Sequence, residues 1–455
     1  MRILIIGAGE VGYNIASRLA SENKKVTVID KDEAAIRRLS ENLDVQSIRA
    51  SATSPKTLIE AGIKESQILL AVTDSDEVNL VTCLLSRHMA PEIKMLARVR
   101  NAELDDFHQR FRKAAPHIDT IINPETEVVG TIRRLMHIPG AVDVGDFVEG
   151  KVSYAGLRIP KSSKMVGMSM SAFSTRFDKD HPLIAAILRN TQVIVPRGDT
   201  RFHANDLIYI ICEKKDLEEK LNLFGLGHKP VKTALVIGGG RIGERLSRTL
   251  VEDGIKTKII ETDLTRCNEL SQEISGALVL HGDGSDQSLL LEENIGQTDV
   301  VVPVTDDDET NILISLLAKS MGARDTITKI GKTNYHPLLP AIGIDKVVSP
   351  RLSAISSILQ DVRKGKVLSD ISIFGEQGEF IEAIALDRSS ITGKPIKKIT
   401  FPKGTLLLCV IQEGQVIIPT GDTVVDPGNR LLLFAVNHAV KKLETLLSVK
   451  FTRKE

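Results

Sequence analysis

Two glycine-rich segments of the chain have the residue types and spacing of a dinucleotide-binding turn. Each contains the pattern GxGxxG directly after a short apolar run, with glycines at Gly7, Gly9 and Gly12 in the first segment and at Gly238, Gly240 and Gly243 in the second. In such a turn the first glycine allows a sharp bend, the second lets the backbone approach a pyrophosphate, and the third lets a helix pack against a strand. The phosphates then lie at a helix N-terminus, where free N–H groups and the helix dipole favour anions.

An acidic residue follows each glycine segment at the end of the next apolar run. Asp30 and Glu261 each come 18 residues after the last glycine, which is the place of the acid that accepts hydrogen bonds from ribose hydroxyls. A carboxylate there repels a 2′-phosphate, so the spacing favours NAD(H) over NADP(H). The alternative is a sheet that kept its glycines for packing and lost its ligand.

The two copies of this pattern differ after their third predicted strand. The second copy reads HGDGSD over His281–Asp286, in which Asp283 is able to accept a hydrogen bond from an adenine amino group. The first copy reads RASATS over Arg49–Ser54 and offers only the neutral contacts of Ser51, Ala52 and Thr53. We therefore expect the two sites to differ in affinity or in ligand.

Acid-rich segments, VTDSDEVN and VTDDDETN, follow the fourth predicted strand of each copy. Because ligands of open parallel sheets bind outside the carboxyl ends of the strands, four residues are expected near the cofactor, namely Thr73, Asp74, Thr305 and Asp306. The other interpretation is that the acids serve as helix caps and first-turn charges, namely Asp76, Glu77, Asp308 and Glu309.

A cation ends the fifth predicted strand of each copy. Arg98 is placed to reach a phosphate, and Lys329 is its approximate counterpart; either could equally pair with an acid on the surface. A guanidinium binds phosphate through a two-pronged fork that an ammonium cannot reproduce. We therefore expect the first site to hold pyrophosphate or triphosphate and the second to hold adenine.

Together these features mark one set of candidate nucleotide-binding residues in each copy. They are Gly7, Ala8, Gly9, Glu10, Val11, Gly12, Asp30, Lys31, Ser51, Ala52, Thr53, Thr73, Asp74 and Arg98 in the first copy, and Gly238, Gly239, Gly240, Arg241, Ile242, Gly243, Glu261, Asp283, Gly284, Thr305, Asp306 and Lys329 in the second. No catalytic or metal-binding group joins them, because the ten histidines follow no metal-spaced pattern and no GxSxG, HExxH or GxxxxGK[ST] occurs.

The order of these segments shows that one unit is repeated twice. The glycine segments recur at an offset of 231 residues (7 to 238), the acid-rich segments at 232 (71 to 303), and the turns IVPRGDT and IIPTGDT at 223 (194 to 417). In each copy, continuous apolar runs alternate with helical patterns, which indicates an α/β fold with a doubly wound parallel (Rossmann) sheet. Short β-rich runs broken by turn signals then indicate a small α+β domain. The predicted domains are Rossmann domains over 1–138 and 231–365 and small α+β domains over 139–225 and 366–455.

The first copy is clear enough for its elements to be placed. Strands are predicted over 2–6, 25–30, 45–49, 67–72, 93–98 and 118–122, and helices near 10–22, 31–41, 54–61 and 76–89.

The composition argues against a nucleic-acid-binding protein and against a membrane-spanning one. Of 455 residues 42% are hydrophobic and the formal net charge is +0, so the basic excess typical of phosphate-backbone binders is absent. Aromatic residues make up 4% and Trp is absent, which disfavours stacking on single-stranded nucleic acid. No apolar run is long enough to span a bilayer, and the four scattered cysteines contain no CxxC pair. We expect a cytoplasmic protein with no nucleic-acid partner.

The order of motifs resembles a known family. GxGxxG, the strand-terminal acid, AVTxxDExN, INPE at Ile122–Glu125, PGAVDVGDF at Pro139–Phe147 and a P-x-GDT domain, all within a duplicated chain, are similar to the TrkA family of peripheral regulatory subunits of Trk potassium uptake systems. The first copy departs from the second in lacking the third-strand acid, and Lys329 replaces the arginine found at Arg98.

This resemblance implies a function without catalytic turnover. Members carry two RCK units, bind NAD(H) and in some cases ATP or ADP, and lie on the cytoplasmic face of a TrkH/TrkG-type potassium-translocating membrane subunit. It also implies a homo-oligomer, a tetrameric ring assembled through the Rossmann parts. The rival interpretations are a regulator of another cation channel and an NAD-dependent oxidoreductase. A transport regulator would co-purify with a membrane protein, an enzyme would turn over NADH with a small substrate, and a neighbouring gene for a potassium-channel subunit would favour the potassium system.

Overall fold

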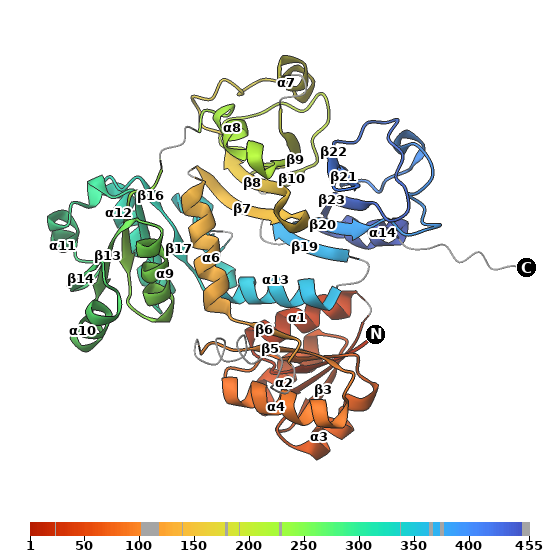
Figure 1. The fold of residues 1–455 in the computed structure, drawn as a ribbon, viewed down its shortest axis with the longest axis horizontal. Helices are drawn as coiled ribbons and strands as arrows, with labels where there is room; N and C mark the ends of the chain where they lie inside the picture. The colour runs from red at the N-terminus through yellow and green to blue at the C-terminus, as the bar shows by residue number, and fades with distance from the viewer. Residues whose placement is uncertain are drawn as a thin grey trace, which may run out of the picture. The chain divides into compact units, whose positions relative to one another are not determined.

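The computed structural model describes residues 1–22, 24–101, 118–138, 140–177, 181–190, 192–226, 230–336, 338–363, 367–373 and 377–447 (Figure 1). Pro139 of the PGAVDVGDF motif and the end of the fourth predicted domain, 448–455, lie outside these residues. The chain forms two compact units: Met1–Val128 with Ser349–Val362, and Val129–Val348 with Arg363–Glu455.

The first unit contains a six-stranded parallel sheet in the order β3-β2-β1-β4-β5-β6, which is the doubly wound arrangement. Its strands are β1 Arg2–Ile6, β2 Lys25–Asp30, β3 Gln46–Arg49, β4 Ile68–Ala71, β5 Lys94–Arg98 and β6 Thr120–Ile122. Its helices are α1 Glu10–Ser21, α2 Glu33–Asn42, α3 Pro55–Glu60, α4 Asp76–Met89 and the first turn of α6 Pro124–His137, with α13 Pro350–Arg363 added from far along the chain. The six strands and the helices α1 to α4 agree with the predicted ones to within two residues.

The continuous apolar strands bury both faces of this sheet. On one face Ile3 and Ile5 share a hydrophobic core with Leu39 of α2. On the other face Leu4 packs with Leu58 of α3 and Cys83 of α4. Helices therefore cover both sides, as expected for a parallel sheet whose strands read as unbroken apolar runs.

Helix α13 completes the core of the first unit although it follows the second parallel sheet in sequence. Its buried side chains Ala354, Ile358 and Val362 belong to the same core as Val11 and Ile15 of α1. Figure 1 shows α13 beside α1. The compact unit thus crosses the boundary between the sequence repeats.

The second unit contains a second parallel sheet, in the order β14-β13-β12-β15-β16. Its elements are β12 Thr233–Ile237, α9 Arg241–Glu252, β13 Lys256–Glu261, α10 Leu264–Glu273, β14 Ala277–His281, α11 Gln287–Glu292, β15 Val300–Pro303, α12 Asp308–Ser320 and β16 Asp325–Thr326, followed by the pair β17 Thr328–Lys329 and β18 Val347–Val348. The fifth strand of this copy is therefore interrupted at Ile327, and its second half pairs only with β18 among the described strands. The predicted α/β fold with two tandem Rossmann sheets is confirmed.

Two small antiparallel sheets complete the second unit. The first, β10-β9-β11-β8-β7, and the second, β19-β20-β23-β21-β22, share one hydrophobic core. Their elements are β7 Ala141–Phe147, β8 Val152–Arg158, α7 Met170–Phe177, β9 Leu183–Arg189, β10 Gln192–Ile194, β11 Leu207–Glu213 and α8 Leu217–Asn222, then β19 Val367–Ile373, β20 Gly378–Ile384, β21 Thr405–Gln412, β22 Gln415–Ile417, β23 Arg430–Val436 and α14 Asn437–Leu447. The ring of Phe380 on the second sheet lies 5.7 Å from Phe147 and 5.3 Å from Tyr154 on the first.

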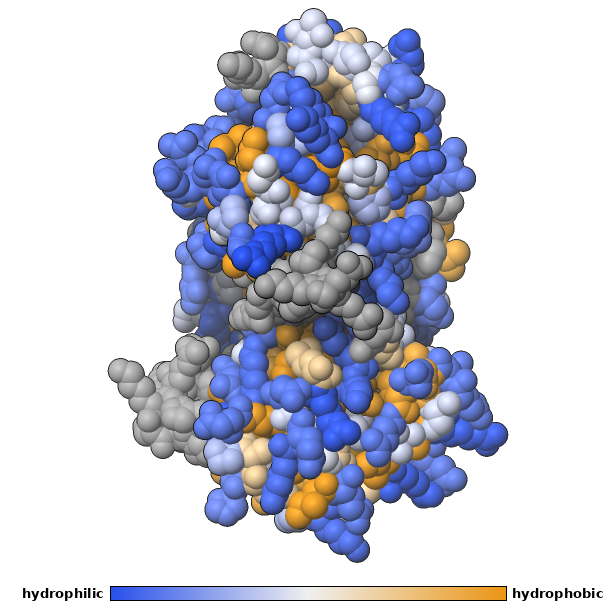
Figure 2. Space-filling model, turned by 90° about the vertical axis from the view of Figure 1, so that its right-hand side faces the viewer, coloured by the Kyte–Doolittle hydropathy of each residue, from blue (hydrophilic) through white to orange (hydrophobic). Residues whose placement is uncertain are grey.

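The face drawn in Figure 2 is largely hydrophilic, with apolar residues exposed in small scattered groups. Within the part of the chain that the structure describes, no helix combines the length and the apolar character needed to cross a membrane.

Candidate nucleotide-binding sites

The glycine turns of the two copies have nearly identical geometry. Gly7 and Gly238 have φ angles of +103° and +104°, a left-handed conformation that glycine adopts without strain. A Cβ added to Gly12 would lie 1.9 Å from the Gly7 carbonyl oxygen, and one on Gly243 would lie 1.8 Å from that of Gly238. Both turns therefore require glycine at their first and third positions, as the spacing predicts.

The middle glycine of each turn faces open space. Among the described residues, no atom lies within 4 Å of the place that a Cβ on Gly9 or Gly240 would occupy. Each of these glycines precedes a helix, α1 or α9, and caps it without a side-chain hydrogen bond. The unsatisfied N–H groups of each helix N-terminus are thus open to an anion.

The side chains within these turns divide between core and surface. Val11 and Ile242 are buried, so those two positions offer a ligand only backbone groups. Lys31, just after β2, and Arg241, at the start of α9, are exposed.

Each strand-terminal acid lies beside its glycine turn and accepts backbone N–H groups there. Asp30 accepts the N–H of Ala8 at 2.5 Å and of Asp32 at 2.9 Å. Glu261 accepts the N–H of Gly239 at 2.6 Å and of Asp263 at 2.9 Å. Glu261 Oε1 also accepts the N–H and the hydroxyl of Thr262, at 2.7 and 3.1 Å. Both Asp30 oxygens and Glu261 Oε2 accept one of these donors each, so they keep a lone pair for a ribose hydroxyl.

The environment of Glu261 keeps its carboxyl ionised. Burial opposes ionisation, but the hydrogen bonds from Asp263, Gly239 and Thr262 together outweigh it and lower the pKa of Glu261 below its usual value. An ionised acid at this position is the form that accepts ribose hydroxyls and repels a 2′-phosphate.

A buried asparagine fixes the loop after the fourth strand in both copies. Asn79 accepts the backbone N–H and the hydroxyl of Thr73 at 2.9 and 2.7 Å, and it donates to the carbonyl of Arg98 at 2.8 Å. Asn311 makes the same bonds with Thr305 at 3.0 and 2.8 Å. Sequence reasoning did not select these asparagines, although both end the repeated blocks AVTDSDEVN and PVTDDDETN.

The acids of these loops have more specific roles than first-turn charges. The capping residues are Ser75, which accepts the N–H of Val78, and Asp307, which accepts the N–H of Thr310. Asp76 instead accepts the N–H groups of the segment after β5, from Arg100 at 2.9 Å and from Asn101 at 2.8 Å.

Its counterpart Asp308 does the same in the second copy. Its carboxylate accepts the N–H of Gly331 at 2.9 Å and of Lys332 at 2.7 Å. Asp76 and Asp308 therefore tie the loop after the fourth strand to the end of the fifth.

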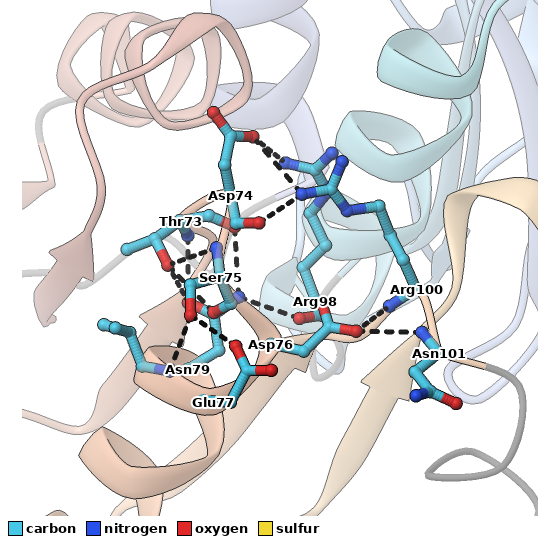
Figure 3. Close-up of polar contacts among 10 residues, drawn as sticks. Thr73, Asp74, Ser75, Asp76, Glu77, Asn79, Arg98, Arg100 and Asn101 are labelled. Atoms are coloured by element: carbon cyan, nitrogen blue, oxygen red, sulfur yellow. Dashed lines mark hydrogen bonds and ion pairs between the residues drawn. The ribbon is translucent and has the colours of Figure 1, made fainter.

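Two arginines converge on one carboxylate in the first copy (Figure 3). Arg98 donates to Asp74 Oδ1 at 3.1 Å, and Arg100 forms an ion pair with the same oxygen at 3.9 Å and donates to the Asp74 carbonyl. Arg98 Nε is buried and has no hydrogen-bond partner among the described residues. Burial, and then the charge of Arg100, lower the pKa of Arg98. Two guanidiniums thus share the single carboxylate of Asp74, while the nearby carboxylate of Asp76 is occupied by backbone N–H groups.

Arg100 is a candidate that sequence reasoning missed. Residues two apart along an extended chain point to the same side, so the spacing of Arg98 and Arg100 carries the signal that would have found it.

The second copy has a balanced pair at the same place. Lys329 donates to the Thr305 carbonyl at 2.8 Å and lies 3.7 Å from Asp306. Gly331 stands where the first copy has Arg100, at the offset of 231 residues. One cation faces one acid here, whereas the first copy sets two cations against one acid.

The segments after the third strand also differ. In the first copy the hydroxyls of Ser51 and Thr53 bond to each other at 2.9 Å, and Ala52 is buried. In the second, Asp283 Oδ1 accepts the N–H of Ser285 at 2.8 Å, which lowers the pKa of Asp283.

Gly284 serves packing in the second copy. A Cβ there would lie 2.1 Å from Ile237 Cγ2 on β12.

A further arginine lies near each glycine turn. Arg38 of α2 bonds to Glu10 of α1 at 2.6 Å. In the second copy Arg266 of α10 bonds to Glu244 of α9 at 2.5 Å and donates to the Gly239 carbonyl at 2.9 Å. The carboxylates of Glu10 on α1 and Glu244 on α9 are therefore both engaged in ion pairs.

Comparisons with known proteins agree with the duplicated design. The TrkA-N domain family model matches residues 3–124 and 234–350, and the TrkA-C domain model matches residues 154–225. The Trk system potassium uptake protein TrkA homolog 1 of Methanosarcina mazei is 37% identical over 451 residues, covering 98% of this chain and 99% of its own. The Trk system potassium uptake protein TrkA of Halomonas elongata is 34% identical, covering 99% of this chain and 100% of its own.

Solved structures show the same fold. The GsuK channel bound to NAD matches with a TM-score of 0.59 at 18% identity, over 98% of this chain and 78% of that one. The crystal structure of the GsuK RCK domain matches with a TM-score of 0.59 over 98% of this chain and 94% of that one. With two TrkA-N matches, a TrkA-C match and relatives aligned from end to end, the chain belongs to the TrkA family.

Proposed function

We propose that this chain is a cytoplasmic, non-catalytic regulatory subunit of a potassium uptake system. It gates a TrkH/TrkG-type membrane subunit in response to NAD(H) and to ATP or ADP. The observation that carries the proposal is the pair of open glycine turns, each at a helix N-terminus beside a strand-terminal acid, in a chain of the TrkA family. The working modules are the Rossmann domains over 1–138 and 231–365 and the small domains over 139–225 and 366–455.

The proposed ligand contacts follow from the geometry of the turns. The backbone at Gly9 and Gly240 takes the pyrophosphate, because nothing described there blocks a close approach. Asp30 and Glu261 take ribose hydroxyls with the lone pairs left after binding the turn.

The cations and the third-strand segments make the two sites unequal. Arg98 and Arg100 offer two guanidiniums to a terminal phosphate, and the unpartnered Nε of Arg98 supports an anionic ligand. Lys329 is already balanced by Asp306, so the second site relies on Asp283 and an adenine amino group. We propose a polyphosphate preference at the first site and an adenine-directed preference at the second.

Ring assembly is proposed through the outer faces of the Rossmann helices. Equivalent positions of the two copies expose large apolar side chains: Ile59 and Leu291 on α3 and α11, and Val81 and Leu313 on α4 and α12. Leu84, one turn beyond Val81 on the same face of α4, is also exposed. Apolar residues repeated at matching solvent-facing positions support a repeated contact, and a tetrameric ring provides one.

Gating then requires the ring to have two shapes. A nucleotide moves such an equilibrium only by the difference between its affinities for the two shapes. Packed interfaces switch between discrete arrangements, so small changes at the sites become a pull on the membrane subunit.

Titration calorimetry of the whole chain with NAD, NADH, ATP and ADP tests the proposal. We expect at least two of these nucleotides to bind, and light scattering to show a mass well above the 49.7 kDa of one chain. Adding the chain to liposomes that contain a TrkH/TrkG-type subunit should make potassium flux depend on the nucleotide. Flux unaffected by the chain, or turnover of NADH by the chain alone, would contradict it.

A further inference from the structure

The segment Arg98–Asn101 lies between the first nucleotide site and the start of α6. Its side chains Arg98 and Arg100 reach Asp74 at the site. Its backbone is held on the other side, where the N–H of Val99 bonds to the carbonyl of Ile122 at 3.0 Å. The motif INPE, which begins at Ile122, therefore adjoins the site without contributing to it.

Asn123 of this motif makes two kinds of contact with one side chain. Its Oδ1 accepts the N–H of Glu125 at 3.0 Å and of Thr126 at 3.3 Å, so it caps α6. Its Nδ2 donates to the carbonyl of Arg100 at 3.4 Å. Asn123 is only 4% exposed, so its amide has no solvent to turn to.

The second copy caps its corresponding helix differently. Ser349 precedes α13 and accepts the N–H of Leu352 at 3.5 Å. The Ser349 hydroxyl caps α13 and has no further hydrogen-bond partner among the described residues. In the first copy, therefore, one side-chain amide both caps the helix and binds the segment that follows the fifth strand.

We propose that Asn123 is a positioning residue that transmits nucleotide binding at the first site to helix α6. The proposal rests on the proposed function. A phosphate bound by Arg98 and Arg100 competes with Asp74 for the guanidiniums and so changes the position of Arg100. Asp76 anchors the N–H groups of Arg100 and Asn101 to the start of α4, so the Arg100 carbonyl, which accepts Asn123 Nδ2, is the part of the residue that passes its displacement to the start of α6.

Asn123→Asp separates the cap from the connection. Aspartate caps a helix as well as asparagine does, but its carboxylate only accepts hydrogen bonds and cannot donate to the Arg100 carbonyl. Ser349→Ala is the matched control, because it removes a cap of the same order at α13 and leaves the Arg100–Asn123 contact intact. Thermal melting of both variants shows whether they fold.

Hydrogen exchange of the full chain with and without ATP, and with NADH, measures the effect. In the wild type we expect slower exchange both at residues 98–101 and at 124–137 of α6. In Asn123→Asp we expect the protection at 98–101 to persist, the dissociation constant to stay within about threefold, and the protection of α6 to be lost. Ser349→Ala should behave as the wild type at α6.

The outcomes are separable. Protection at 98–101 without any change in α6 of the wild type, or unchanged α6 protection in Asn123→Asp, would overturn the role of Asn123 and leave the proposed function standing. Absence of nucleotide binding to the wild type would instead overturn the proposed function, and this inference with it.

Discussion

The two nucleotide sites share a backbone and differ in charge. Both have a left-handed first glycine, a third glycine pressed against the first, and a buried asparagine that holds the loop after the fourth strand. In contrast, two arginines and one acid meet in the first site, whereas one lysine and one acid meet in the second. The comparison teaches that the residues that make the turn possible are repeated, while the charged side chains beside the turn differ.

The shared backbone should be the most sensitive part of either site. We expect Gly12→Ala to lower the free energy of unfolding of the first unit by about 3 kcal/mol, the upper end of overpacking costs, because its Cβ would meet the Gly7 carbonyl oxygen at 1.9 Å. Urea unfolding followed by circular dichroism measures this.

Gly9→Ala is the matched control for that change. Nothing described lies within 4 Å of its Cβ, so we expect a stability change of no more than about 1 kcal/mol. It should nevertheless reduce nucleotide affinity at the first site, because the methyl group occupies the approach of the phosphates. Equal stability losses in the two variants would contradict the comparison.

The charge difference should decide ligand preference. We expect Arg100→Gly to weaken ATP binding at the first site by roughly tenfold to a hundredfold, since charged hydrogen bonds contribute about 1.5–3 kcal/mol. Gly331→Arg should strengthen ATP binding at the second site. Calorimetry of the full chain compares them, and variants with the same ATP affinity as the wild type would show that Arg100 does not contact the ligand.

The strand-terminal acids should act alike in both copies. Asp30→Asn keeps one oxygen for the turn and removes the charge, so we expect NADH binding to weaken by about 1–2 kcal/mol, roughly tenfold. Glu261→Gln should have the same effect at the second site. Relative affinity for NADPH should rise in both, and a dissociation constant unchanged in either variant would remove that acid from its site.

The smallest effect concerns acid stability. The ammonium of Lys332, and then the hydroxyl of Tyr335, lower the pKa of Glu309 to about 2. Because the folded pKa lies below the unfolded value near 4.3, this contribution is complete above about pH 4.3 and disappears as the pH falls to about 2.

Glu77 is the equivalent residue of the first copy, where the hydroxyl of Ser75 lowers its pKa. We expect Glu309→Gln to flatten the dependence of unfolding on pH between about 4.3 and 2 more than Glu77→Gln does. Unfolding at several pH values and low salt measures the difference, and a larger effect of Glu77→Gln would reverse the comparison.

Strands such as β1 and β4 of the first sheet could be predicted well because each is a continuous apolar run. Ile3 to Ile6 and Ile68 to Ala71 are buried on both faces, and such runs have few alternatives to a parallel strand. The interruption at Ile327 could not be read in this way, because DTITK has the residues of one short strand. The glycine turns were predictable for a similar reason, since a φ of +103° leaves glycine as the residue without strain.

Contacts between distant segments could not be predicted from one copy. The apolar stripe of α13 indicates that the helix packs on something but does not say on which unit. It packs with Val11 and Ile15 of α1, in the core of the first unit. Arg100 was missed for a related reason. Its importance depends on Asp74, an exposed residue 26 positions earlier that the fold brings next to it.

The position of α13 also has a consequence for synthesis of the chain. Lys94 bonds to the Asp361 carbonyl across 267 residues of sequence, and α13 supplies part of the core beneath α1. As the ribosome releases the chain from its N-terminus, the part of this core that α13 supplies is therefore missing until most of the protein has been made. The core of the first unit is thus completed late, and a nascent chain stopped after the first repeat would expose the apolar surface that α13 covers.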